Sequence, residues 1–186
     1  MAADTPAARA ADADFDPMQL FSGCHARIHE RMGMMQALAE MLDVGAPTPP
    51  AAARLADTIV RFYESTVLAH HREEEQELWP MLERVGNDSD IETFKAIGKR
   101  LKDEHQQLEA LWDSLTPELR RLAKGKAARI DPGKLSQLAQ AYDQHAAFED
   151  AVVIPMARFL LSPSDQSRLN ISIALRRMPV GLRSYI

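Results

Sequence analysis

Hydrophobic residues recur every three or four positions along most of the chain, which is the spacing of one buried face of an α-helix. Four long stretches show this period, and segments rich in proline, glycine or asparagine separate them. The first begins near Pro17 and ends at Gly45, the second ends before Gly86, the third is interrupted by Pro117, and the fourth starts at Pro132. No stretch alternates in the manner of a β-strand, so we predict an all-α protein.

Each predicted helix has a seam of positions that should face the core. The seams of the first two helices are Met18, Phe21, His25, Ile28, Met32, Met35, Ala39 and Leu42, and then Leu55, Ile59, Phe62, Thr66, His70, Glu74, Leu78 and Met81. The seams of the last two are Phe94, Ile97, Leu101, His105, Leu108, Trp112 and Leu115, and then Leu135, Leu138, Tyr142, His145, Glu149, Val152, Met156 and Phe159.

Short connections between helices favour antiparallel neighbours. We therefore expect an up-down-up-down antiparallel four-helix bundle over residues 17–161. Residues 1–16 are rich in alanine and aspartate and lack an apolar period, so we expect a mobile N-terminal tail. Residues 162–186 should form a C-terminal helical extension, in which the weakly amphipathic stretch 164–177 predicts a short fifth helix. Pro117 should end the third helix, with a short helical segment after it up to Lys124.

Composition and charge narrow the function classes. With 186 residues, 46% of them hydrophobic, the chain can bury the core of one domain. Its net charge of −5 gives no electrostatic reason to expect nucleic acid or anionic lipid as a partner. No long apolar run predicts a membrane span, and the single Cys24 rules out an internal disulfide or a cysteine-rich zinc site. We expect a soluble cytoplasmic protein, either a monomer or a homodimer.

One ten-residue phrase occurs twice, as His70-x3-Glu74-x5-Pro80 and as His145-x3-Glu149-x5-Pro155. A histidine and a glutamate four residues apart lie on the same face of a helix. Here that face is the seam, and burying ionisable groups without partners costs several kcal/mol each. Such groups usually pair or bind a metal, so the repeat predicts a metal site.

The seam also contains His25 on the first helix and His105 on the third. His25 and His70 lie the same number of residues from the connection between their helices. The count across the other two connections differs by about one residue, which is a rise of only about 1.5 Å along a helix. In an antiparallel bundle the four histidines therefore reach one layer, together with the two glutamates.

Imidazole and carboxylate ligands together suit iron, manganese, zinc or copper, whereas magnesium and calcium favour oxygen ligands alone. Six side chains exceed what one tetrahedral zinc ion needs. Two metal ions bridged by Glu74 and Glu149 would use them all.

These residues resemble the hemerythrin-like (HHE cation-binding) domain family from about Pro17 to about Leu161. The motifs that carry the resemblance are Phe21-Ser-Gly-Cys-His25-Ala-Arg-Ile28, His70-His-Arg-Glu-Glu-Glu-Gln-Glu-Leu-Trp-Pro80, Glu104-His105 and His145-Ala-Ala-Phe-Glu149. The resemblance implies a non-haem di-iron centre, with two iron ions joined by an oxo or hydroxo bridge, and zinc or manganese as alternatives. It implies that His70, Glu74, His145 and Glu149 supply a histidine and a bridging carboxylate from each of two helices. His25 and His105 match the single histidines of the other two.

The sequence departs from the oxygen-carrying hemerythrins at Leu101, where their third helix offers a second histidine. We therefore expect two histidines per metal and an open coordination that suits small-ligand chemistry or redox change better than reversible oxygen carriage. His29 is the candidate for the missing nitrogen ligand, with a partly exposed role near the site as the alternative. His71 should face a helix boundary or solvent.

Several nearby residues have two readings each. Cys24 fits a redox thiol or a small packing residue, and we expect packing. Core packing is also the expectation for Tyr63 and Tyr142, with hydrogen bonding to the site or phenol redox chemistry as alternatives. We expect a solvated stripe from the acidic run Glu73, Glu75 and Glu77.

Three function classes remain open. The favoured one is a binding or sensing protein, in which the metal centre takes up O2, NO or peroxide, or responds to iron or redox status, and signals to a protein partner. The second is a di-iron oxidase or peroxidase for detoxification. The sequence shows no substrate pocket and no acid–base pair, so we rank this class below a binding or sensing protein. The third is a structural or storage role for the metal.

Overall fold

The computed structural model describes residues 16–43, 50–86 and 91–177, and nearly all of these residues are helical. The prediction of an all-α protein is confirmed for this part of the chain, which contains no strand. The predicted N-terminal tail, apart from its last residue, lies outside the described residues, as do the last nine residues of the predicted C-terminal extension.

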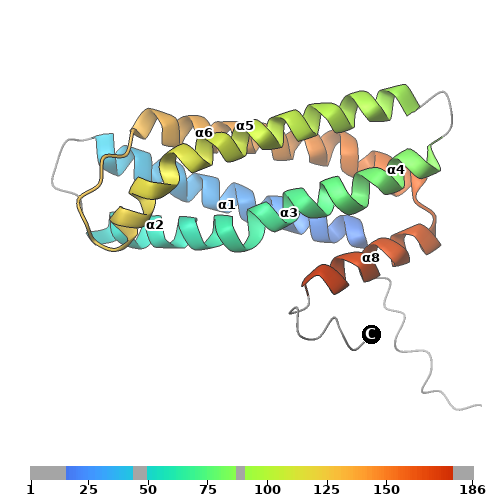
Figure 1. Ribbon diagram of the computed structural model, residues 1–186, viewed down its shortest axis with the longest axis horizontal. Coiled ribbons are helices and arrows are strands. Elements are labelled where there is room, and N and C mark those ends of the chain that lie inside the picture. Colours follow the sequence, from blue (N-terminus) through green and yellow to red (C-terminus); the bar gives the residue numbers. More distant parts are fainter. Residues whose placement is uncertain (1–15, 44–49, 87–90, 178–186) are drawn as a thin grey trace, which may run out of the picture.

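Four long helical rods make up the body of the molecule (Figure 1). The first is α1 (Pro17–Asp43) and the third is α5 (Ile91–Ala123). The second consists of α2 (Pro50–Phe62), α3 (Leu68–Glu73) and α4 (Trp79–Val85), joined by the π-helical turns η2 (Tyr63–Val67) and η3 (Glu74–Leu78). The fourth consists of α6 (Pro132–Phe148), the π-helical turn η4 (Glu149–Val153) and α7 (Ile154–Leu160).

Each rod packs mainly against two others, and the second and fourth rods also touch through α4 and α7. Helix α1 contacts α2 and α6, and α5 contacts the same two helices from the other side. A further helix, α8 (Pro163–Arg177), lies outside this ring and contacts α1 and η3 (Figure 1). Among the described residues, no helix is both long and apolar enough to cross a membrane.

The hydrophobic core is divided into two clusters by one layer of polar side chains. On α1, Phe21 belongs to one cluster and Ile28 to the other, with His25 between them. On α5, Leu101 and Leu108 flank His105 in the same way. The same division occurs on the other two rods, so the polar layer is enclosed by apolar packing on both sides.

The two copies of the repeated phrase fold alike. In each copy the glutamate, Glu74 or Glu149, starts a π-helical turn, and Pro80 or Pro155 follows that turn. Proline has no N–H to return to the carbonyl four residues earlier, and its ring clashes with that carbonyl. The helix widens instead, and the residue before each proline donates its N–H to the glutamate carbonyl five positions earlier.

A π-helical turn contains an additional residue, so it rotates the following helix by about 100° relative to the predicted face. From the last residue of η4 onward the buried residues include Val153 and Ala157, each one position later than predicted. Phe159, which the sequence pattern places in the core, is 88% exposed. The predicted seam is therefore wrong beyond Glu149, because it assumes an uninterrupted α-helix.

Helix α5 continues through Pro117, so the predicted interruption is also wrong. Leu115, Leu119 and Leu122 are buried on one face across the proline. Each contributes about 2 kcal/mol by burial, and together they exceed the cost of about 3 kcal/mol for proline inside a helix. Packing therefore keeps the segment helical.

Candidate metal centre

Seven ionisable side chains converge in the polar layer, and none of these residues is more than 5% exposed. Six of them are the residues that the sequence brings to one level, and the seventh is His71. They are His25 from α1, His70 and His71 from α3, Glu74 from η3, His105 from α5, His145 from α6 and Glu149 from η4.

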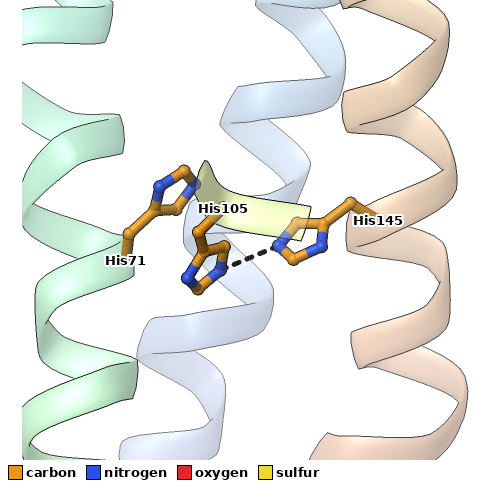
Figure 2. A group of neighbouring side chains, drawn as sticks. All are labelled: His71, His105 and His145. Carbon is orange, nitrogen blue, oxygen red and sulfur yellow. Dashed lines mark hydrogen bonds between the residues drawn. The ribbon is translucent and has the colours of Figure 1, made fainter. Parts of the chain in front are cut away.

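The five histidines form two groups. His25 and His70 form the two-histidine group, whose ring centroids are 4.8 Å apart. His71, His105 and His145 form the three-histidine group, and Figure 2 shows their rings converging from three rods. Within the second group the Nε2 atoms of His105 and His145 are 3.1 Å apart. In each group the donor atoms lie within 4.8 Å of one another, which is close enough to surround one ion.

Glu74 and Glu149 each reach both groups with different oxygens. Glu74 Oε1 lies 3.2 Å from His70 Nε2, while Oε2 lies 3.4 Å from His105 Nε2. Glu149 Oε2 lies 3.1 Å from His25 Nε2, while Oε1 lies 3.4 Å from His145 Nε2. Each carboxylate therefore spans the space between the two histidine groups, as a bridging ligand would.

Many of these donor atoms have no hydrogen-bond partner. They include Nε2 of His25, His70 and His71, Oε2 of Glu74 and both carboxylate oxygens of Glu149. Unsatisfied buried polar atoms are rare because each costs about 1–3 kcal/mol. So many in one layer fit metal ions, and the mixture of imidazole and carboxylate fits iron, zinc or manganese.

Four of the five imidazoles are held from behind by a carboxylate. The Nδ1 atom donates a hydrogen bond of 2.8–2.9 Å in each case, which leaves Nε2 directed to the centre. Carboxylates in this position orient a ligand ring and raise its basicity. The pairs are His25 with Asp150, His71 with Glu109, His105 with Glu75 and His145 with Glu104.

The layer holds strongly shifted pKa values. Burial lowers the pKa of His25, but the carboxylates of Glu149 and Glu74 outweigh it and raise the pKa to about 11. Burial also lowers the pKa of His105, but the Glu74 carboxylate outweighs burial and raises that pKa to about 9. At His70 burial is the larger effect and lowers the pKa to about 3. Burial and the Glu74 carboxylate raise the pKa of Glu149, whereas the surrounding imidazoles hold that of Glu74 well below its usual range against burial. Protons and metal ions therefore compete for the same atoms.

The sequence prediction for His71 is wrong, since this residue is 2% exposed and lies in the three-histidine group. The prediction follows a seam from Thr66 to His70 along a regular α-helix. The widened turn η2 changes that register, and the buried face runs through Tyr63 and Val67 to His71 while His70 also remains inside. Burial lowers the pKa of His71, which keeps the ring neutral and able to bind metal.

The structure does not bring His29 into either histidine group. Its side chain is 76% exposed, and Nδ1 donates to Asp143 Oδ1 at 2.9 Å. Although His29 follows His25 by four residues on α1, its side chain lies at the surface beside α6 rather than in the polar layer. The nitrogen that the sequence analysis sought from His29 is offered by His71 instead.

The acidic run in the second rod is not a solvated stripe. Glu73 is buried and pairs with Arg177, and Glu75 accepts the His105 hydrogen bond. The carboxylates behind the imidazoles were missed at the sequence level, although a signal was present. Glu75 and Asp150 directly follow Glu74 and Glu149, Glu104 precedes His105, and Glu109 follows it by four residues.

The two tyrosines near the site make a hydrogen bond to each other, with their hydroxyl oxygens 2.5 Å apart. Tyr63 also stacks on Trp112 with ring centroids 3.8 Å apart, and Tyr142 stacks beside His71. Burial raises the pKa of both phenols. They pack in the core, as expected, and form an aromatic wall behind the three-histidine group.

Comparison with known proteins agrees with this geometry. The family described as "Hemerythrin HHE cation binding domain" matches residues 16–157, a range that contains all seven converging residues. The chain is also similar to an uncharacterized protein of Haemophilus influenzae, with 24% identity over 162 residues. That similarity covers 87% of this chain and 90% of the relative.

Proposed function

The chain belongs to the hemerythrin HHE cation-binding domain family, and we propose that it holds two non-haem iron ions and binds or senses a small ligand such as O2, NO or peroxide. The observation that supports a pair of ions is the reach of Glu74 and Glu149, whose two oxygens each face different histidine groups. A single ion would leave one oxygen of each carboxylate without a positive partner.

The assignment of ligands follows the two groups. His25 and His70 would hold one ion, His71, His105 and His145 would hold the other, and the two glutamates would bridge them. Bound iron would supply a coordination site for an exogenous ligand and a reversible change of oxidation state. The two-histidine group offers fewer protein ligands, so the exogenous ligand should bind on that side.

The chain's own residues restrict what reaches the centre. The seven residues are almost wholly buried between two apolar clusters, so without movement only small ligands fit beside them. Asp150, Glu75, Glu104 and Glu109 hold four of the rings, and His70 is the exception. Its ring is positioned by packing, including the contact with Phe21 at 5.8 Å between centroids.

We also propose a bundle topology that explains why the ligands from all four rods lie in one layer. In an up-down-up-down antiparallel bundle of residues 17–161, each rod contributes its ligands at mid-length, as the division of the core on every rod supports. Residues 162–186 then form an extension outside the bundle, to which α8 belongs.

Metal analysis and one spectrum test the proposal. Protein purified without added metal should contain about two iron ions per chain and show ligand-to-metal charge-transfer absorption that shifts when azide is added. Glu74→Gln and Glu149→Gln should lower the iron content, whereas Glu83→Gln, at an exposed position of α4, should not. A colourless protein that contains only zinc would overturn the proposal in favour of a structural metal. Turnover of peroxide that Glu74→Gln abolishes would show an enzyme instead.

A further inference from the structure

A cavity of about 510 Å³ lies between α1, the second rod and α8, outside the metal centre. Arginines from three helices line it, together with two hydroxyl groups from the widened turn η2. These six residues are Arg27, Arg72, Arg176, Arg177, Ser65 and Thr66. The volume is typical of sites that bind small molecules, which are about 300–1,000 Å³.

Two of the four arginines already have carboxylate partners. Arg177 donates from Nε and from a terminal nitrogen to the two oxygens of Glu73, each at 2.7 Å. Glu73 is 3% exposed, so this pair forms a fixed part of the cavity wall. Arg176 pairs with Glu77. These two pairs hold the end of α8 against the second rod and give the cavity its shape.

The other two arginines are not in ion-pair contact with a carboxylate. Among the described residues, neither Arg27 nor Arg72 forms an ion pair with a carboxylate. Two unpaired guanidinium groups thus face one cavity of a protein whose net charge is −5.

We propose that this cavity binds a small organic anion that carries at least two acidic groups, either carboxylates or phosphates. The planar guanidinium forks of Arg27 and Arg72 would each receive one acidic group, since such forks match carboxylate and phosphate oxygens. Ser65 and Thr66 can donate hydroxyl hydrogen bonds to the same groups. The arginine side chains are outside the two histidine groups, so this binding does not require the metal centre.

Titration calorimetry at low salt tests the proposal, with citrate as the polycarboxylate probe and inorganic pyrophosphate as the phosphate probe. At least one probe should bind to the purified, metal-containing protein, and the two titrations together show which acidic group the cavity prefers. Arg27→Ala combined with Arg72→Ala should weaken that binding roughly 30-fold or more, because each removes a charge-assisted contact. The double variant Arg54→Ala with Arg129→Ala makes the same change of net charge at exposed positions away from the cavity and should leave binding within about twofold.

A further double variant, Arg27→Lys with Arg72→Lys, keeps the charge but loses the forks, and should give an intermediate affinity. Both arginines are exposed, so the variants should fold, which circular dichroism checks. Absence of binding by both probes would overturn the proposal. Binding that the two alanine substitutions leave unchanged would also overturn it, and a loss of that binding on removal of the metals would place the anion on the metals.

Discussion

His71 Nδ1 donates a hydrogen bond of 2.9 Å to Glu109 Oε1 on α5. The same hydrogen bond is the main reason that the pKa of Glu109 lies below its usual range, so the acceptor is a carboxylate. Because the proton is on Nδ1, Nε2 is free, and it is buried without a partner next to the stacked ring of His105. His71 thus offers a third nitrogen on the side where Leu101 offers none.

The metal content of two variants should show that His71 is a metal ligand and that His29 is not. His71→Ala should reduce the iron content from about two to about one ion per chain, because the three-histidine group loses a nitrogen ligand. His29→Ala should leave the iron content and the azide-shifted spectrum unchanged, since its ring is exposed and bonded to Asp143. Metal analysis after gel filtration gives both numbers. Equal iron in the two variants would show that His71 is not a ligand.

The carboxylates behind the imidazoles should affect affinity without being ligands. Glu104→Gln and Asp150→Asn each remove the charge that orients one ring, and we expect metal affinity to fall about 10- to 100-fold while the number of sites stays the same. Asp143→Asn is the matched control, because Asp143 bonds only the exposed His29 in this region. Competition with a coloured chelator measures the affinities. Wild-type affinity in both variants would mean that packing alone orients the rings.

The level of the site could be predicted from sequence because it depends on counting along helices. On α5, the predicted neighbours Leu101 and Leu108 are buried on either side of His105. Periodicity alone is sufficient there, since α5 has the regular α-helical repeat from end to end.

The register around the π-helical turns could not be predicted in the same way. The sequence pattern placed His71 outside the core and Phe159 inside it, and both predictions were wrong. Each residue comes after a π-helical turn, η2 or η4, and the additional residue of such a turn does not interrupt the spacing of apolar residues in the sequence. Pro80 and Pro155 marked the places where the helix departs from the α-helical pattern. A proline predicts that a hydrogen bond is missing, but whether the helix kinks or widens depends on what packs around it.

Because the register shifts after η4, substitution of Phe159 should lower the free energy of unfolding much less than substitution of Leu161. Phe159→Ser should change the free energy of unfolding by less than about 0.5 kcal/mol, because the ring is 88% exposed. Leu161→Ala should cost about 2–4 kcal/mol, since Leu161 is 4% exposed within a core cluster. Urea unfolding of the metal-loaded protein measures both. If Phe159→Ser is the more damaging change, the π-helical turn is not present in solution.

Below pH 6.5, His70 and His71 should make the metal-free protein less stable as the pH falls, against an opposite contribution from Glu149, whose pKa is raised. His70 and His71 have lowered pKa values in the folded state, so the unfolded chain binds more protons than the folded protein below pH 6.5. Stability from these two groups therefore rises as the pH rises toward 6.5. Glu74, whose pKa is also lowered, adds the same slope at more acidic pH.

Above pH 6.5 the slope should reverse in the metal-free protein. His25 and His105 keep their protons up to about pH 11 and about pH 9 in the folded state, whereas the unfolded chain loses them near pH 6.5. The folded protein then binds more protons, and its stability falls by up to about 1.4 kcal/mol per pH unit for each proton. Metal ions displace these protons, so the metal-loaded protein should not lose stability between pH 7 and 9. Urea unfolding across that range, with and without a chelator, should give diverging curves, and a metal-free protein that becomes more stable above pH 7 would contradict the charge arrangement described for His25 and Glu149.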